Sequence, residues 1–469
     1  MKQKEYDITS AQSIVNYGMK LLGHSLRELH PEAKIFNGKG GLGTSVEYYH
    51  YDYEPNSESR PDFPEAGLEL KCTPLKLLAD NSMGSKERLV LNIINFIEEA
   101  DKTFETSSFW NKNKFLLLMF YLHESGVDPV DMLFKLIRTW EFPKEDLKII
   151  RDDWSKIHSM ILDGKADELT EGHTFYLAAC MKGGKAGEDM RKQPFSEKRA
   201  QQRAYSLKSG YINKIILASY LDAKFRQQLN ISSKRLVALQ KKYSSENVVK
   251  SIKAYKHGET FEELIERRMK PYYGKTVGLI IKKLGVELNY SSKDFSYHVC
   301  RAILGVKSRK IQEFENAGVF LKTIALEANR DYIVESMSFP YIKFVDIVNQ
   351  SWEDSDWYNL LTSKFFFVVF RKSSDDVKPH MKLEKVFFWN MPRADLAIAE
   401  ELWYDTKQKV MRGDYDNFIT TKSHPVCHVR PHGTKGQTVE TPQGIRVQPK
   451  CFWLNNDYIL DVVKKMMSL

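Results

Sequence analysis

Apolar and polar residues alternate along the chain in two different patterns. Between residues 11 and 30 the apolar side chains recur at the spacing of a helix, and residues 44–51 fit a second, shorter helix. Short apolar runs at 68–71, 114–121 and 174–180 predict strands, several of them buried on both faces. Helices and strands in this succession indicate an α/β chain built on a central mixed sheet.

The pattern occurs twice. Residues 61–71 read PDFPEAGLELK, and residues 312–322, which lie 251 positions further on, read QEFENAGVFLK. Nearly the same offset relates the segment AYSLKSGYI (204–212) to CFWLNNDYI (451–459). Matches that keep their order over so long a stretch indicate two copies of one domain.

The repeat sets the expected domain boundaries. The first copy is predicted over residues 1–225 and the second over 259–469. Between them, residues 226–258 are rich in Lys, Ser and Gln and contain no Pro, and no Gly before Gly258. This composition predicts a polar helical connector rather than a flexible linker.

Two acidic residues and a lysine carry the candidate chemistry of the first copy. Glu69 and Lys71 point to the same side of a strand, while Leu70 points into the core. A turn at residues 64–67 would bring Asp62 back beside Glu69, and both carboxylates are expected near solvent at the strand end. Paired carboxylates suit Mg²⁺, which polarises a phosphodiester, and a lysine can orient water or stabilise the developing charge.

This arrangement is the PD-(D/E)xK pattern of nucleases, which is common by chance when it occurs alone. The repeat makes it more specific. In the second copy Glu313 stands at the position of Asp62, and Phe320 at that of Glu69, while the lysine persists as Lys322. The first copy is therefore predicted to bind metal, and the second to have lost its metal site.

A glycine-rich run lies upstream of this motif. Lys39-Gly-Gly-Leu-Gly43 precedes the predicted short helix, which carries Glu47 in its first turn. Such a run lets backbone N–H groups approach a phosphate, although a glycine-rich run by itself more often marks a plain loop. His298 replaces Glu47 in the second copy, so a third acid is also missing there.

Composition limits the class of protein. The 469 residues are 42% hydrophobic and 28% charged, which is typical of a globular chain and excludes general disorder. The longest apolar run, 365–370, is too short to span a membrane, and the first residues lack the apolar core of a secretory signal. Five dispersed cysteines without a C-x-x-C motif argue for a reducing compartment, and we expect a cytoplasmic protein.

The charge distribution allows a polyanionic partner. The net charge is +9, and residues 182–214 contain nine Lys or Arg against three Asp or Glu. A solvated basic face is the alternative explanation of this stretch.

Longer strings of sequence point to a family. The runs KGGLGTSVE, PDFPEAGLELKCTPLK and SKERLVLNIINF resemble the MutH-like nucleases, and more closely the GATC-cutting type II restriction endonucleases built from two MutH-like domains, the Sau-type enzymes. The resemblance covers essentially the whole chain. It implies a restriction-endonuclease-like PD-(D/E)xK fold, a mixed sheet flanked by helices, duplicated as two domains.

The same resemblance implies an activity. These enzymes hydrolyse double-stranded DNA with Mg²⁺ and cut 5′ of the guanine of GATC, which leaves four-nucleotide 5′ overhangs. A cognate DNA methyltransferase would be the functional partner, and dimerisation on DNA is possible. The acidic and lysine positions of the family active site fall on Glu47, Asp62, Glu69 and Lys71, with the three acids as metal ligands. Two further family lysines fall on Lys39 and Lys114.

The family reads DNA with an Arg-Pro pair, which only the second copy keeps, at Arg430-Pro431 with His432 close by. The first copy has no such arginine at 176–182. Its base contacts are expected instead from a set of polar residues: Lys182, Arg191, Gln193, Arg203 and Lys208. In the second copy Lys322, Arg430 and His432 are the candidates for contact with guanine or phosphate.

Alternatives remain open at this point. His424, Cys427, His428 and His432 are residue types that bind zinc, although a DNA-contacting strand edge agrees better with Arg430-Pro431. For the whole chain, the alternatives to a restriction enzyme with a regulatory second domain are a MutH-type nicking endonuclease of mismatch repair and a DNA-binding regulator that does not cut. The length argues against the first alternative, and the complete acidic set in the first copy argues against the second.

Overall fold

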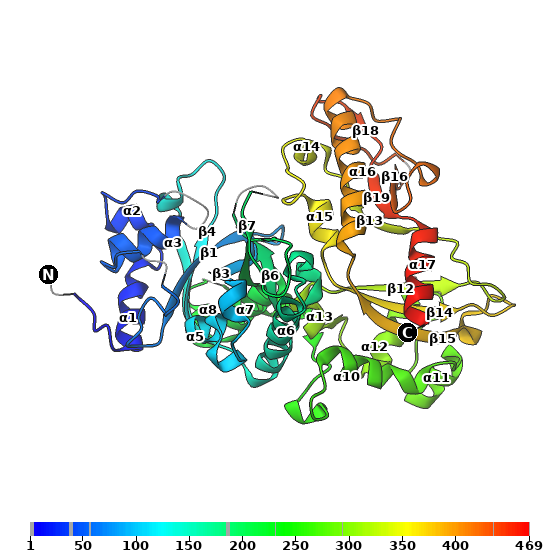
Figure 1. The fold of residues 1–469 in the computed structure, drawn as a ribbon, viewed down its shortest axis with the longest axis horizontal. Coiled ribbons are helices and arrows are strands. Elements are labelled where there is room, and N and C mark those ends of the chain that lie inside the picture. Colours follow the sequence, from blue (N-terminus) through cyan, green and yellow to red (C-terminus); the bar gives the residue numbers. More distant parts are fainter. Residues whose placement is uncertain are drawn as a thin grey trace. The chain divides into compact units, whose positions relative to one another are not determined.

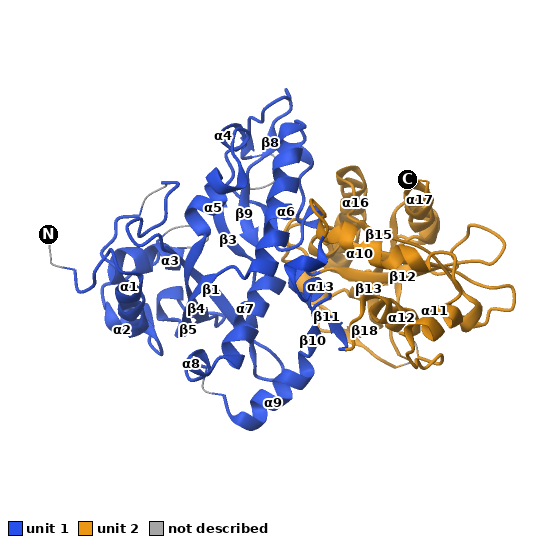
Figure 2. Cartoon of the chain, turned by 90° about the horizontal axis from the view of Figure 1, so that it is seen from below, with its two compact units in different colours: residues 1–255, 308–318 blue, residues 256–307, 319–469 orange. Residues whose placement is uncertain are grey.

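The protein consists of two compact units of mixed α/β structure (Figures 1 and 2). The computed structural model describes residues 4–36, 41–55, 58–183, 188–229, 231–292, 294–434 and 436–468. Unit 1 comprises Met1–Tyr255 and Ser308–Gly318, and unit 2 comprises Lys256–Lys307 and Val319–Leu469. From the sequence we expected domains at 1–225 and 259–469 with a connector at 226–258. The two units differ from these bounds in two places, because residues 226–255 and 308–318 both pack with unit 1.

Unit 1 is built on two sheets. The first has the strand order β2-β1-β4-β5, with β1 parallel to β4 and β4 antiparallel to β5, and the second has the order β3-β9-β6. Its helices are α1 (Ala11–Gly18), α2 (Leu26–Leu29), α3 (Gly41–Ser45), α4 (Phe96–Glu99), α5 (Ser108–Asn113), α6 (Lys144–Leu162), α7 (Ser209–Leu221), α8 (Ala223–Arg226), α9 (Ser233–Lys242) and α13 (Gln312–Ala317). Its strands are β1 (Glu69–Leu77), β2 (Met83–Ser85), β3 (Leu89–Ile93), β4 (Phe115–Leu122), β5 (Phe134–Glu141), β6 (Leu177–Met181), β7 (Met190–Arg191), β8 (Ala200–Gln201), β9 (Arg203–Leu207), β10 (Ser245–Glu246) and β11 (Lys310–Ile311).

Among its described residues, unit 2 repeats this strand order except for β2, which has no counterpart there. Its sheets are β12-β14-β15, with β12 parallel to β14 and β14 antiparallel to β15, and β13-β19-β16. Its helices are α10 (Phe261–Met269), α11 (Val277–Leu284), α12 (Phe295–Leu304), α14 (Phe344–Ile347), α15 (Asp356–Leu361), α16 (Arg393–Arg412) and α17 (Asn456–Met467). Its strands are β12 (Phe320–Leu326), β13 (Met337–Tyr341), β14 (Phe365–Arg371), β15 (Lys382–Trp389), β16 (Cys427–Pro431), β17 (Val439–Glu440), β18 (Arg446–Val447) and β19 (Lys450–Leu454).

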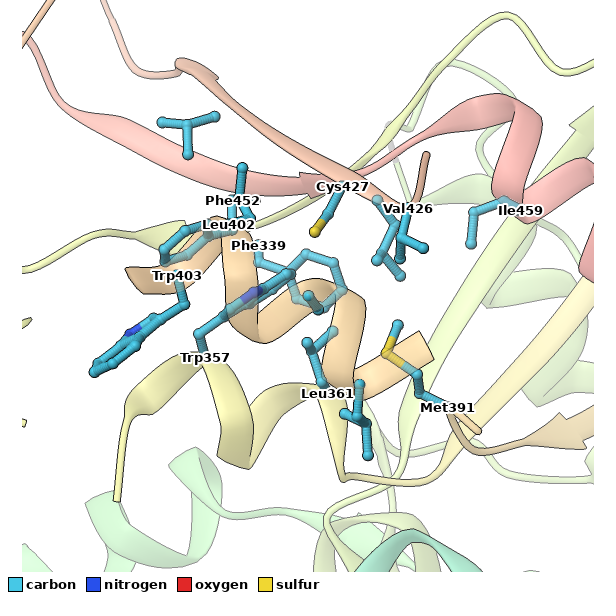
Figure 3. Close-up of a cluster of buried hydrophobic side chains, with 14 of the residues drawn as sticks. Phe339, Trp357, Leu361, Met391, Leu402, Trp403, Val426, Cys427, Phe452 and Ile459 are labelled. Carbon is cyan, nitrogen blue, oxygen red and sulfur yellow. The ribbon is translucent and has the colours of Figure 1, made fainter. Parts of the chain in front are cut away.

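The apolar runs of the sequence form the interior strands. Residues 116–120 of β4 and 365–369 of β14 are completely buried, which explains why neither run alternates with polar residues. In unit 2 the core gathers aromatic side chains between the sheets and α15 and α16 (Figure 3). There Trp357 stacks on Phe452 with ring centroids 4.7 Å apart and meets Phe339 edge-on at 4.9 Å.

The helix predicted over 11–30 is interrupted. α1 ends at Gly18, and Gly23 adopts a φ of 85°, a conformation that favours glycine. The Gly23 N–H donates to the Phe134 carbonyl of β5 at 2.9 Å, so this contact replaces the helical hydrogen bond. α2 then begins after Ser25, whose side chain forms a reciprocal cap with Glu28.

The segment 226–258 is only partly helical. It contains the end of α8, helix α9 and the short strand β10, which pairs in parallel with β11. Helix α13, which directly follows β11 in the chain, packs across α7. Its Glu313, the counterpart of Asp62, is buried and accepts hydrogen bonds from the N–H groups of Val248 and Val249, each at 2.9 Å. This acid therefore holds the connector in place and does not face a second active site.

Gly210 allows α13 to approach α7 closely. A Cβ atom at Gly210 would lie 2.6 Å from the Asn316 carbonyl oxygen and would also overlap with that of Glu315. Both are backbone atoms of α13, so a rotamer change cannot relieve the clash.

We predict that Gly210→Ala destabilises the protein, although alanine favours a helix over glycine by about 1 kcal/mol. Urea unfolding should give a lower midpoint for Gly210→Ala and an unchanged one for Ser209→Ala at the exposed neighbouring position. A Gly210→Ala protein at least as stable as the wild type would show that α13 does not dock on α7.

Candidate active site

The turn before β1 brings the predicted acidic residues together. Phe63 and Leu68 exchange two backbone hydrogen bonds, of 3.0 and 3.1 Å, and Gly67 closes the turn with a φ of 62°. As a result, Asp62 lies beside the first residue of β1, as the sequence predicts.

Asp62 and Glu69 are joined through the backbone. The N–H of Asp62 donates to Glu69 Oε2 at 3.0 Å, and the N–H of Leu70 donates to Asp62 Oδ2 at 3.0 Å. The side chain of Asp62 is 12% exposed, whereas that of Glu69 is 0% exposed. The expectation that both carboxylates lie near solvent is wrong for Glu69, which is fully buried at the start of β1, where this strand pairs with β4 at Leu116.

Lys71 forms an ion pair with Glu69, two residues earlier on the same side of β1. Burial alone would lower the pKa of Lys71, but the charges of Glu69 and Asp62 outweigh this effect and raise it. Lys71 therefore stays protonated, with its ammonium group held against the acidic pair.

Lys112 of α5 is a second cation that sequence reasoning missed. Its Nζ lies 3.5 Å from Glu69 Oε1 and 3.9 Å from Asp62 Oδ1, and it donates to the carbonyls of Glu58 and Arg60 at 3.1 Å each. Lys114, which the family resemblance suggested for this role, is exposed at the end of α5. The two lysines are only two residues apart in the sequence, and the resemblance pointed to the second of them.

Glu47 completes the acidic group. It lies in the helical turn Val46–His50, whose closing hydrogen bond runs from the N–H of Tyr51 to the carbonyl of Val46 at 3.2 Å. This i→i+5 bond marks a widened turn of the kind often found at functional sites. Burial, followed by the charge of Asp62, raises the pKa of Glu47 to about 7.

The donor set fits a hard divalent cation. Burial raises the pKa of Glu69 to about 7, Lys71 and Lys112 lower it, and Asp62 raises it. Carboxylates that repel one another in this way gain from a cation between them, and their oxygens suit Mg²⁺. Within the described part of the chain no three His, Cys, Asp or Glu side chains stand close enough together to hold a metal. To hold a metal ion together, the carboxylates would have to move closer to one another, and Glu69 would have to release Lys71.

In unit 2 the strand that corresponds to β1 in the sheet order is β12, which begins at Phe320. Phe320 replaces Glu69 and is half-buried against Phe365, with ring centroids 5.6 Å apart. Lys322 donates to the Ser338 carbonyl at 3.2 Å and lies over the Phe339 ring, and burial lowers its pKa.

Three of the expected DNA-reading residues in unit 1 are buried. Gln193 accepts from the N–H of Ala166 at 2.7 Å and donates to Asp167 and to the Lys198 carbonyl. Arg203 is 5% exposed and Lys208 is 9% exposed. Each holds a loop or strand of the protein: Arg203 donates to the Ala179 carbonyl at 3.4 Å, and Lys208 to the Thr174 carbonyl at 2.6 Å. As the structure stands, all three side chains are engaged in contacts within unit 1.

The remaining candidates of unit 1 differ in accessibility. Lys182 is half-buried, and Arg191 is exposed on β7, where its Nε donates to Gln202 at 2.6 Å. Lys39 lies outside the described residues.

In unit 2, Arg430 and His432 are exposed at the end of β16. The guanidinium of Arg430 lies 3.7 Å from the centroid of the Trp453 ring, and His432 meets the same ring edge-on at 5.1 Å. The zinc interpretation of this segment is not supported. His424 instead receives the N–H groups of Val426 and Cys427, and His428 Nδ1 bonds to Asn455 at 2.6 Å.

Comparison with known proteins identifies the class of this fold and site. The family model of the DNA mismatch repair enzyme MutH matches residues 51–153 and 304–401, so each unit contains a MutH-like region. The DNA mismatch repair protein MutH of Vibrio parahaemolyticus is 24% identical over 43% of this chain and 91% of its own length. That of Escherichia coli strain K12 is 24% identical over 37% of this chain and 73% of its own length.

A longer match gives the family. The type II restriction enzyme Sau3AI of Staphylococcus aureus is 31% identical over 97% of this chain and 99% of its own length. The chain belongs to the Sau3AI-like family of type II restriction enzymes with MutH-like domains. None of the helices formed by the described residues combines the length and apolar character that a membrane span requires.

The contrast between Lys112 and Lys114 is testable. We predict that Lys112→Ala lowers the single-turnover cleavage rate about 10²–10³-fold, as expected when a preorganised charge at a reacting phosphate is removed. Lys114→Ala, two residues away and exposed, should change the rate less than threefold. The reverse result would assign the site lysine to Lys114, and thermal unfolding of both variants would control for their folding.

Proposed function

We propose that the protein is a Mg²⁺-dependent type II restriction endonuclease that hydrolyses double-stranded DNA at GATC. It cuts 5′ of the guanine and leaves four-nucleotide 5′ overhangs. The observation that carries this proposal is the buried Asp62–Glu69–Lys71 group at the start of β1, with Glu47 and Lys112 beside it. The specificity rests on the resemblance of the chain to GATC-cutting enzymes.

The residues of the site have separate roles in this proposal. Asp62, Glu69 and Glu47 would hold Mg²⁺, which supplies Lewis-acid polarisation of the phosphodiester when bound. Lys71, released from Glu69, would orient the attacking water or stabilise negative charge on the phosphate. Lys112 would neutralise the acidic group and fix the segment before Asp62 through the carbonyls of Glu58 and Arg60.

We further propose that unit 2 descends from a duplicated restriction-endonuclease-like domain that no longer cuts. The shared strand order of the two units and the two MutH matches support this origin. Phe320 removes a metal ligand, whereas Lys322, Arg430 and His432 keep basic groups in unit 2. Unit 2 would bind a second GATC duplex and regulate unit 1, directly or by dimerisation on DNA, in a cytoplasm where a methyltransferase protects the host sites.

Two other functions are less well supported. A MutH-type nicking enzyme would share the site but not the second unit, and the relative that matches over the whole chain is a restriction enzyme. A regulator that does not cut would have no reason to retain Glu47, Asp62 and Glu69 together, where burial, and after it the neighbouring acids, raises the pKa of Glu47 and of Glu69 to about 7.

Isosteric changes at the acids test the chemistry. Asp62→Asn and Glu69→Gln keep the shape of the buried pair but remove the charge that binds a cation. Each should reduce cleavage of a GATC plasmid more than 100-fold, because a metal ligand stabilises the transition state, and each should still bind DNA. Sequencing the ends made by the wild type would show the cut position, and Glu65→Gln, in the turn, is the matched control. More than a few per cent of wild-type cleavage by Glu69→Gln would contradict the assignment.

Regulation by unit 2 predicts a dependence on the number of sites. A two-site plasmid should be cut faster than a one-site plasmid, and a short GATC duplex added in trans should accelerate cleavage of the latter. Arg430→Ala should remove this stimulation without moving the cut. Equal rates on both plasmids, unaffected by Arg430→Ala, would show that unit 2 is a scaffold.

A further inference from the structure

The hairpin between β7 and β8 presents a single exposed aromatic side chain. Phe195 lies at its tip, within residues 192–199, and is 76% exposed. The half-buried Pro194 precedes it, and the chain returns through Ser196 into β8. A phenylalanine in water forgoes the burial that normally stabilises an apolar side chain, and among the described residues Phe195 is the most exposed large apolar side chain.

The backbone of Phe195 is strained. Its φ is 59°, in the left-handed region that bulky residues avoid. A turn with proline at its second position and positive φ at its third normally has glycine there. The hairpin between β17 and β18 in unit 2 shows the relaxed solution, because its positive φ of 76° falls on Gly444. Strain kept at an exposed residue is typical of functional positions.

The tip is held from both sides. The buried side chain of Gln193 bonds to the N–H of Ala166, to Asp167 and to the carbonyl of Lys198, which fixes the two arms of the loop to the turn after α6. Gly164 packs so closely that a Cβ atom there would lie 2.6 Å from the Phe195 carbonyl oxygen. These contacts fix the backbone from which the Phe195 ring projects.

Basic residues stand on both sides of Phe195 in the sequence of the hairpin. Four exposed basic residues flank the tip against one acidic residue, Glu197; they are Arg191, Lys192, Lys198 and Arg199. A surface for another protein would pair an exposed apolar residue with apolar neighbours, whereas an apolar wedge among cations matches the way proteins unstack base pairs while gripping the phosphates.

We propose that Phe195 inserts between base pairs of the bound DNA, next to or within the site that unit 1 cuts, with the flanking lysines and arginines on the phosphates. The inference rests on the proposed nuclease function and adds a residue that deforms the substrate. In this role Phe195 positions the DNA for Asp62 and Glu69. Gln193, buried and unable to read bases, holds the wedge in place.

Fluorescence of 2-aminopurine tests the wedge, because this base brightens when it loses its stacking. Duplexes with 2-aminopurine at successive positions in and beside GATC would be titrated with the full-length protein, with Ca²⁺ in place of Mg²⁺. The wild type should give an increase at one base step, which Phe195→Gly and Phe195→Ala abolish, and binding should weaken about tenfold, the size expected for one lost stacking contact. Phe195→Trp should retain the signal.

The matched measurements separate a wedge from a folding effect. Phe195→Gly relieves the strained φ, so its melting temperature should equal or exceed that of the wild type while its cleavage rate falls. Lys198→Ala should weaken binding in a salt-dependent manner and leave the fluorescence increase intact. Val237→Ala, an exposed apolar residue on α9, should change nothing.

Three results would overturn the proposal. A wild type that binds GATC duplex without any fluorescence change, and whose cleavage is unaffected by Phe195→Gly, would exclude the wedge and leave the nuclease function standing. A Phe195→Gly protein with an unchanged fluorescence signal but an altered sedimentation coefficient would assign Phe195 to a protein interface. A wild type that neither binds nor cuts DNA would exclude the wedge and the proposed function together.

Discussion

The site depends on one constraint, the burial of Glu69 beside Asp62. The turn at 64–67 reverses the chain so that Glu69 accepts the N–H of Asp62 and Asp62 accepts the N–H of Leu70. The side chain of Glu69 is completely shielded from water. Two negative charges, with a third at Glu47, are then crowded in a poorly solvated place. Burial is the main cause that raises the pKa of Glu47 and of Glu69 to about 7; the neighbouring acids raise both further, and Lys71 and Lys112 lower them. A divalent cation bound between the carboxylates would relieve their mutual repulsion. The burial that makes this place unfavourable for negative charge therefore also makes it suited to metal binding.

Unit 2 has an apolar residue at the position that corresponds to Glu69. With Phe320 in place of Glu69, β12 keeps its parallel pairing with β14, because an apolar side chain at this position packs against Phe365 without any need for a counter-charge. The acid at the position of Asp62 has acquired a structural task instead. Glu313 accepts two backbone N–H groups of the connector and lies on α13, which packs on α7 in unit 1 although the sequence places it in the second copy. The parallel pairing of β12 with β14 therefore does not require an acid at the first residue of β12.

The sequence predicted the strands that carry the site, the turn at 64–67 and the meeting of Asp62 with Glu69, because these follow from local periodicity and turn chemistry. It did not predict contacts that depend on tertiary packing. Lys112 rather than Lys114 faces the acids because the last turn of α5 sets which lysine points inward. Gln193, Arg203 and Lys208 belong to a basic stretch that appears suited to DNA, yet tertiary contacts bury all three. The break at Gly23 and the docking of α13 likewise arise from β5 and α7, far away in the chain.

Locating the metal tests the central claim most directly. Crystals of the full-length protein with a GATC duplex and Mn²⁺ in place of Mg²⁺ would reveal the ion by its anomalous scattering. The account predicts a peak in unit 1 coordinated by Asp62 and Glu69, with Glu47 within reach, and none at the Phe320–Lys322 position of unit 2. A peak at that position in unit 2, or a Mn²⁺ ion in unit 1 that makes no contact with Asp62 or Glu69, would contradict it.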